Sequence, residues 1–197
     1  MLLRLLPWIF LFSCSQLTPT ATEKSTIGIV SLEAENTIPM SLLCKQIEDF
    51  YKCKCVVLTP AKMPQNAFNP ERNRYRADSI LNFLDSARSD SIDILMAVTS
   101  YDISCTVKNH KDWGVFGLGR CPGRSCVISD FRLKNNVSNT VKLQRLKNVA
   151  LHEIGHNFGL PHCGDSLCLM KDAKGKISNV EGTNRQLCSR CHDRIFE

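Results

Sequence analysis

The chain of 197 residues is long enough for one domain with a hydrophobic core, and 43% hydrophobic with 22% charged residues is typical of a globular protein. The formal net charge of +6 comes from lysines and arginines scattered along the sequence, so charge alone does not indicate a nucleic-acid site. The eleven cysteines are divided among the N-terminus, the body of the chain and its C-terminal end, so they do not share one chemistry.

The first fourteen residues, MLLRLLPWIFLFSC, predict an export signal. One positive charge at Arg4 precedes an apolar run that is too short to cross a bilayer as a helix. The end of this run resembles a bacterial lipoprotein box, in which Cys14 would carry the lipid. An unlipidated secretory signal, or an apolar strand of a cytoplasmic protein, is the alternative. Residues 15–25 are polar and without periodicity, which predicts a tether to a domain over 26–197.

Three segments after the tether predict an alternation of strands and helices. The β-branched residues of 26–34 predict a strand, and residues 53–60 predict a second strand that ends at a proline. Between them, the apolar residues of 39–51 recur at helical spacing and predict an amphipathic helix.

A second helix is predicted over residues 69–88, with Asn69 as its N-cap and Pro70 at its first position. Residues 91–104 then form a mostly apolar run of strand length. The helix is expected to pack through one apolar stripe, which contains Ala77, Ile80, Leu81 and Leu84.

Two further strands are predicted over residues 113–120 and 126–133, around a turn rich in glycine and proline. Residues 139–159 then have helical spacing over about five turns. This order of elements indicates an α/β domain, in which helices cover a sheet. Beyond Gly159 the periodicity stops. The remaining segment is so polar that it needs a cross-link, such as a disulfide or a bound metal, to fold.

The last turns of the long helix carry a candidate metal site. His152 and His156 are four residues apart, so they project from one helix face and can reach one ion, while Glu153 can reach a water on that ion. Gly159 can take the positive φ that turns the chain back, and His162 then supplies the third ligand that a catalytic zinc needs. The alternative is that these histidines are ordinary surface or core residues that bind no metal.

A second candidate site follows directly. Two cysteines, a spacer and a C-x-x-C pair have the spacing of a closed four-thiolate zinc site, which supplies folding energy but no open position for chemistry. Two disulfides are the alternative, because the chain is expected to be exported. The four residues are Cys163, Cys168, Cys188 and Cys191.

The remaining histidines and cysteines lack such a context. We interpret His110 and His192 as structural. The body cysteines could form up to three disulfides in an exported protein, with Cys121 and Cys126 as the easiest local pair, or stay as buried thiols in a reducing compartment. The six body cysteines are Cys44, Cys53, Cys55, Cys105, Cys121 and Cys126.

The pattern H-E-x-x-H-x-x-G-x-x-H with a downstream methionine resembles the metzincin clan of zinc peptidases. The continuation is similar to the full signature of the archaemetzincin (archaelysin) family, and weaker similarity extends over about residues 26–197. The residues that carry this resemblance after the helix are His162, Cys163, Cys168, Met170, Cys188 and Cys191.

The resemblance implies a metzincin-like α/β (α+β) domain, with a twisted mixed sheet over a long active-site helix and a small zinc-stapled C-terminal segment. It implies a catalytic zinc on His152, His156 and His162, with Glu153 as general base and acid. It also implies a structural zinc on the four C-terminal cysteines, and it places Met170 beneath the site as a packing residue that is not a ligand.

These features predict a peptidase with two zinc ions that cleaves peptides or proteins, either as an aminopeptidase or as an endopeptidase. We expect an exported monomer that binds no nucleic acid and contacts a membrane only through a lipid anchor. As in metzincins, the substrate is expected to pair with an edge strand, supplied by residues 126–133 or by the neighbouring strand.

Two other classes of function are alternatives. An anchored binding or scaffold protein would have structural zinc sites and vestigial hydrolase activity, but a purely structural three-histidine site needs no base such as Glu153. A zinc-ribbon nucleic-acid module would use the four cysteines, but the export signal and the lack of an aromatic and basic patch argue against it.

Overall fold

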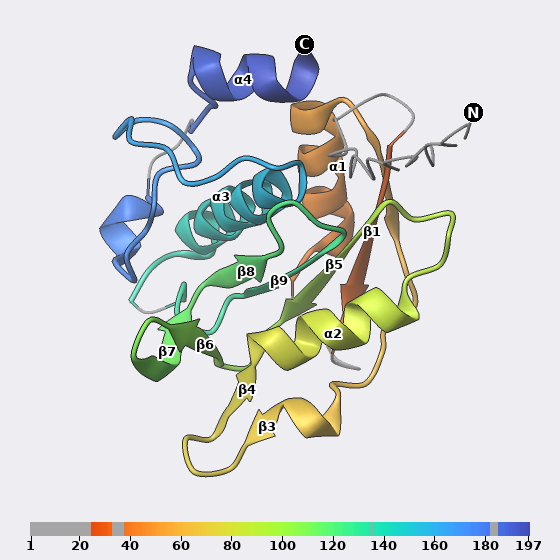
Figure 1. Ribbon diagram of the computed structural model, residues 1–197, viewed down its shortest axis with the longest axis vertical. Coiled ribbons are helices and arrows are strands. Elements are labelled where there is room, and N and C mark those ends of the chain that lie inside the picture. The colour runs from red at the N-terminus through yellow and green to blue at the C-terminus, as the bar shows by residue number, and fades with distance from the viewer. Residues whose placement is uncertain (1–24, 33–37, 135, 182–184) are drawn as a thin grey trace, which may run out of the picture.

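The computed structural model describes residues 25–32, 38–134, 136–181 and 185–197 (Figure 1). The predicted signal over residues 1–14, and all of the predicted tether except Ser25, lie outside these ranges. Among the helices described, none is both long and apolar enough to cross a membrane.

The larger sheet has five strands in the order β2-β1-β5-β9-β8. The first four strands are parallel, and β8 pairs antiparallel with β9 at the edge of the sheet. All residues of β5 and β9 are buried, as expected for parallel strands with both faces covered. The strands are β1 (Thr26–Ser31), β2 (Lys54–Val57), β5 (Ile94–Thr99), β8 (Gly117–Gly119) and β9 (Ser125–Ser129).

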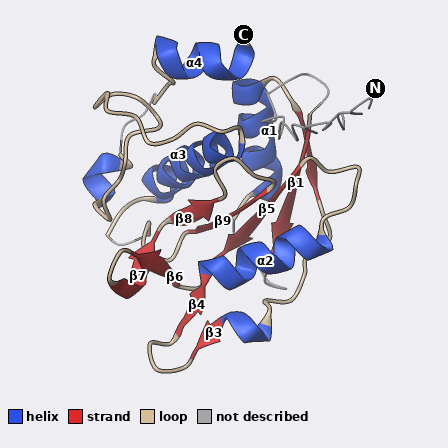
Figure 2. Ribbon diagram, viewed as in Figure 1, coloured by secondary structure: helices blue, strands red, loops and turns tan. Residues whose placement is uncertain are grey.

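Helices cover both faces of this sheet (Figure 2). Because successive side chains of a strand point to opposite faces, Met96 packs with α1 and α3, whereas the next residue, Ala97, packs with α2. A mixed sheet covered by helices confirms the predicted fold class. The helices are α1 (Met40–Tyr51), α2 (Ala77–Ala87), α3 (Asn139–Asn157) and α4 (Ser189–Phe196), with the short 3-10 turns η1 (Gln65–Ala67) and η2 (Ile177–Asn179).

A second sheet of four strands, in the order β3-β4-β6-β7, lies beside the first. Strands β6 and β7 form an antiparallel hairpin, and β4 pairs parallel to β6. Strands β3 and β4 precede α2, and the β6-β7 hairpin carries the chain from β5 to the edge strand β8. The strands of this sheet are β3 (Phe68–Asn69), β4 (Arg74–Arg76), β6 (Ile103–Val107) and β7 (His110–Val115).

The predicted start of the second helix at Asn69 is wrong, because α2 begins at Ala77. Asn69 ends β3, and the following residues form β4. The Arg74 guanidinium lies 3.3 Å from the Asp102 carboxylate and 3.2 Å from the Asp112 carboxylate. Strand pairing and these ion pairs outweigh the local capping preference. The predicted stripe of Ala77, Ile80, Leu81 and Leu84 is buried as expected.

The strand predicted over residues 113–120 is divided at Phe116. Its first part belongs to β7 in the smaller sheet, and its second part is β8 in the larger sheet. This change of sheet brings both strands to the same side of α3, which is where the candidate site lies (Figure 1).

Candidate metal centre

The three histidines of the sequence motif come together at the end of α3. The ring centroids of His152 and His156 are 4.6 Å apart on one helix face. Gly159 has a φ of 87°, which glycine adopts without strain, and it reverses the chain after the helix. His162 therefore returns to within 5.4 Å of His152 and 4.8 Å of His156, measured between ring centroids.

Two of the three rings have a hydrogen-bond partner at Nδ1, and the third ring lies near a carboxylate. His152 Nδ1 lies 2.9 Å from the Leu169 carbonyl oxygen, and His156 Nδ1 lies 2.7 Å from the Leu160 carbonyl oxygen. His162 Nδ1 lies 4.0 Å from a carboxylate oxygen of Asp172. Such partners orient an imidazole and leave its Nε2 for a metal ion.

Burial keeps His152 and His156 neutral, which is the form that binds metal. It lowers the pKa of His152 to about 3 and that of His156 to about 4. One ligand atom from each of the three histidines lies within 4.8 Å of the others, which fits a single ion. A donor set of three imidazoles is typical of catalytic zinc.

Glu153 points from α3 toward the edge strand β8. Burial raises the pKa of its carboxyl group to about 8, while a hydrogen bond from the Gly119 backbone N–H acts in the opposite direction. The absence of side chains at Gly117 and Gly119 makes this approach feasible, since a β-carbon at Gly117 would lie 2.7 Å from the Glu153 Cγ. The two glycines therefore give the carboxyl group its place between helix and strand.

A cleft of about 850 Å³ opens over these residues. Strands β7 and β8 line one side of the cleft, α3 forms its floor, and the segment 171–180 lines the other side. The three histidines and Glu153 all line it, so a ligand in the cleft can reach them.

Met170 is fully buried and packs against Gly155, which lies between the two helical histidines in the sequence. Its position agrees with the predicted role as a packing residue.

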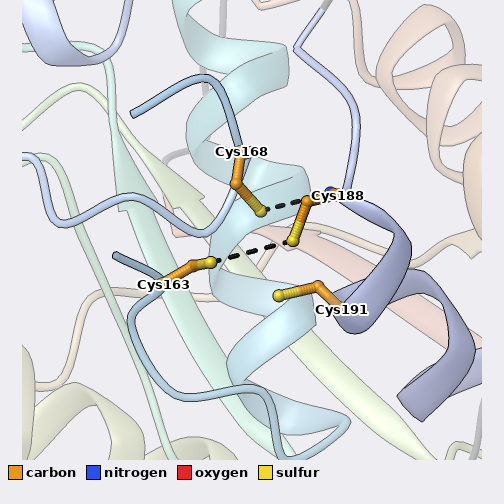
Figure 3. A group of neighbouring side chains, drawn as sticks. All are labelled: Cys163, Cys168, Cys188 and Cys191. Atoms are coloured by element: carbon orange, nitrogen blue, oxygen red, sulfur yellow. Dashed lines mark hydrogen bonds between the residues drawn. The ribbon is translucent and has the colours of Figure 1, made fainter. Parts of the chain in front are cut away.

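The four C-terminal cysteines form a second cluster, shown in Figure 3. One sulfur atom from each lies within 4.8 Å of the others, and the Cys163 and Cys188 sulfurs are 3.8 Å apart. That separation is too long for a disulfide, whose sulfurs are about 2 Å apart. A tetrahedral zinc site with Zn–S bonds of about 2.3 Å places its sulfurs about 3.8 Å apart. All four cysteines are free, and they are Cys163, Cys168, Cys188 and Cys191.

Two groups stabilise a thiolate in this cluster. The Asp165 backbone N–H and the Arg190 guanidinium, which lies 3.3 Å from the Cys163 sulfur, lower the pKa of Cys163 to about 7. A metal ligand must be a thiolate, so this environment favours metal binding at Cys163, whereas burial raises the pKa of Cys168 and Cys191 in the absence of a metal.

The remaining predicted residues lie apart from the two clusters. His192 is exposed on α4 next to Phe196, whereas His110 begins β7 and lines the cleft. The six body cysteines, for which disulfides and buried thiols were the two alternatives, are free in this structure: Cys121 is exposed, and the buried ones are Cys44, Cys53, Cys55, Cys105 and Cys126.

Sequence reasoning missed Gly117, Gly119 and Asp172. The glycines had a detectable signal, because a glycine inside a strand pattern indicates a close approach of other atoms. Asp172 had none, since its proximity to His162 depends on the folded path of the chain.

Comparison with known proteins matches this architecture. The sequence pattern described as "Peptidase family M54" covers residues 42–197. An archaemetzincin from Halobacterium salinarum is 31% identical over 159 residues, which are 76% of this chain and 87% of that protein. An archaemetzincin from Methanopyrus kandleri is 34% identical over 135 residues, covering 68% of this chain and 73% of that protein.

Two solved structures agree with these matches. The crystal structure of the Methanopyrus kandleri archaemetzincin superposes with a TM-score of 0.75 at 27% identity, covering 88% of this chain and 94% of that one. The archaemetzincin from Archaeoglobus fulgidus, crystallised with malonate, gives a TM-score of 0.72 at 26% identity and covers 86% and 99%. The family predicted from the histidine and cysteine spacing is confirmed, and the chain therefore belongs to peptidase family M54, a family of zinc metallopeptidases that includes the archaemetzincins.

Proposed function

We propose that this protein hydrolyses peptide bonds with a water molecule, with Glu153 as the general base. The observation that carries the proposal is the convergence of three imidazoles, with ligand atoms within 4.8 Å of one another, beside a buried glutamate in an open cleft. His152, His156 and His162 would hold the catalytic zinc.

The residues present fit such an ion. Burial keeps His152 and His156 neutral, and the Nδ1 atoms of both rings are at hydrogen-bond distance from backbone carbonyl oxygens. Among the described residues the cluster contains no fourth ligand, which is the arrangement of a catalytic rather than a structural site. A zinc ion held there supplies Lewis acidity, which lowers the pKa of water and polarises a carbonyl group.

Glu153 moves the proton. In its ionised form the carboxylate accepts a proton from the attacking water, and it then delivers this proton to the leaving amine. The pKa of about 8 describes the carboxyl group without a neighbouring cation. A positive charge nearby favours the ionised form, which is the form that a base requires.

The substrate is proposed to lie along β8. Residues 126–133 cannot offer a free edge over most of their length, because β9 is paired with β5 on one side and β8 on the other. The neighbouring strand β8 ends the sheet order, so its outer edge can pair with an extended peptide. This edge passes directly over Glu153.

The four cysteines are proposed to hold a second zinc ion. Cys163 follows the third histidine directly, so a metal here fixes the loop that brings His162 back. Cys188 and Cys191 lie at the start of α4, and the ion would attach this helix to the same loop (Figure 3).

We also propose that the protein is exported as a monomer and anchored through Cys14, as the sequence of residues 1–14 predicts. Mass spectrometry of the mature N-terminus tests this part separately. A mature chain that retains Met1 would contradict it.

The test of the peptidase proposal is Glu153→Gln, with Glu71→Gln on an exposed turn as the control. We expect the Glu153 variant to retain both zinc ions by mass spectrometry and to lose turnover of a peptide library, while the control keeps both. Turnover at the parent's rate would exclude the general base. Failure of the parent to cleave any peptide would instead favour the anchored binding protein considered above.

A further inference from the structure

The charged groups that line the cleft are unevenly distributed. Apart from the histidines, its acidic groups are Glu153 and Asp172, and both lie beside the proposed catalytic zinc site. Its cationic groups outnumber them, and they are Lys108, Lys171, Lys174 and Arg185.

Lys108 and Lys174 come from opposite walls of one end of the cleft. Lys108 lies in the turn of the β6-β7 hairpin, and Lys174 precedes Gly175 in the opposite segment. The two walls meet at this end, because a β-carbon at Gly175 would lie 3.3 Å from the Trp113 ring. Cys121 and Pro161 also line the cleft, near the end of β8 at Gly119, and neither side chain is charged.

These four cations are not neutralised by the protein. In the ranges that the structure describes, none of them takes part in an ion pair. Arg185 donates to backbone carbonyl oxygens at distances of 2.9 and 3.3 Å. By contrast, Arg74 of β4 and Arg132, in the turn after β9, both pair with Asp102.

The direction of β8 relates this end of the cleft to the substrate. The strand runs from Gly117, next to β7, toward Gly119, near Cys121. Antiparallel strand pairs are more common than parallel ones, so we expect a bound peptide to pair antiparallel to β8. Such a peptide runs in the direction opposite to β8, and its C-terminal part lies toward Trp113. Residues after the scissile bond would therefore meet the cationic end.

We propose that this end of the cleft recognises a carboxylate on the C-terminal side of the scissile bond. The inference rests on the proposed peptidase function and names its substrate class. The carboxylate is either an Asp or Glu side chain or the free C-terminus of a short peptide. A cleft lined by one sign of charge concentrates ligands of the opposite sign, and salt screens this attraction.

The test compares matched peptides with the zinc-loaded full chain. One series exchanges Glu for Gln at each position on either side of the scissile bond, and a second series exchanges a free C-terminus for an amide. We expect kcat/KM to be about three to ten times higher with a carboxylate after the scissile bond, and the advantage to shrink at high salt. The series that shows the effect identifies the source of the carboxylate.

The variant that removes the cationic end is Lys108→Gln with Lys174→Gln. We expect it to lose the preference while it cleaves the Gln and amide peptides like the parent. The control is Lys54→Gln with Lys62→Gln, which removes the same charge from exposed positions outside the cleft lining and should keep the preference. Calorimetric binding of the same peptides to Glu153→Gln gives a second measurement that requires no turnover.

The outcomes separate this inference from the peptidase proposal. If the parent cleaves both members of each pair equally, prefers carboxylates only before the scissile bond, or keeps its preference in the Lys108 and Lys174 variant, the inference is wrong and the peptidase proposal stands. If the parent cleaves no peptide at all, the peptidase proposal fails and the inference fails with it.

Discussion

Gly155 of α3 and Met170 are in direct contact, since a β-carbon on Gly155 would lie 2.5 Å from the Met170 sulfur and 3.2 Å from the Tyr51 hydroxyl oxygen. Met170 and Tyr51 are fully buried, so neither has free space to move into. The residue before Met170 supplies the carbonyl oxygen at 2.9 Å from His152 Nδ1. The contact therefore sets the distance between the helix and the group that orients its first histidine.

Gly155→Ala is expected to destabilise the protein and to weaken zinc binding. The added methyl group overpacks a buried contact, which costs about 1–3 kcal/mol. Gly164→Ala is the control, because its β-carbon would meet no atom within 4 Å. Urea unfolding and equilibrium dialysis with zinc measure the two effects. Equal stability and zinc affinity in both variants would mean that the Met170 side chain moves aside without loss of stability.

Gly119→Ala is expected to reduce turnover more than zinc binding. Its β-carbon would lie 2.7 Å from the Glu153 carbonyl oxygen, so β8 must move away from α3. Misplacement of a catalytic group by about 1 Å can cost about a hundredfold in rate, whereas the histidines keep their places. The measurement is kcat/KM together with zinc content, with Gly164→Ala again as the control. A loss of zinc equal to the loss of rate would contradict this explanation.

The sequence predicted what depends on neighbours along the chain. The periodicity of α1 and α3, the strands β1, β2 and β9 and the histidine spacing are all local patterns, and the structure reproduces them. The runs 91–104 and 113–120 are instead each divided between strands of the two sheets. The start of α2 failed because β4 is held by strand pairing and by ion pairs to Asp102 and Asp112, which are distant in sequence. Local capping signals contain no information about such long-range contacts.

Parts of the site were unpredictable for the same reason. Lys108 and Lys174 are far apart in the sequence and line the same cleft only because the β6-β7 hairpin folds toward the segment after Met170. Helix α4 was also missed, because its eight residues are mostly polar and only Cys191 and Ile195 are buried.

Asp172→Asn is expected to weaken binding of the catalytic zinc about tenfold, because outer partners of metal-binding histidines orient the ring and raise its basicity. The matched control is Asp193→Asn, whose carboxylate lies 3.4 Å from His192 on α4, another exposed histidine and aspartate pair. Zinc competition with a fluorescent chelator measures both affinities. If the two variants bind zinc equally, the contact between Asp172 and His162 has no role in holding the ion.

Cys188→Ser is expected to lose one zinc ion and to lower the free energy of unfolding, since a closed site contributes its metal affinity to folding. The control is Cys121→Ser, which removes an exposed thiol outside the cluster. Native mass spectrometry counts the ions, and thermal unfolding reports stability. Retention of two tightly bound ions would show that the four thiols do not form a site.

The metal-free protein is expected to gain stability from Glu153→Gln, by an amount that grows with pH. Burial raises the pKa of Glu153 from 4.5 to about 8, so between these values the folded state binds a proton that the unfolded state has released. The folded parent therefore loses stability as pH rises through this window, by about 3 kcal/mol at pH 7, whereas glutamine does not titrate. The lowered pKa values of His152 and His156 destabilise the folded state in acid, but they do so in both proteins and cancel in the difference. Urea unfolding of the chelator-treated parent and variant from pH 4.5 to pH 8 measures this difference in the free energy of unfolding. If the difference does not change with pH, Glu153 is solvated as an ion when the metal is absent.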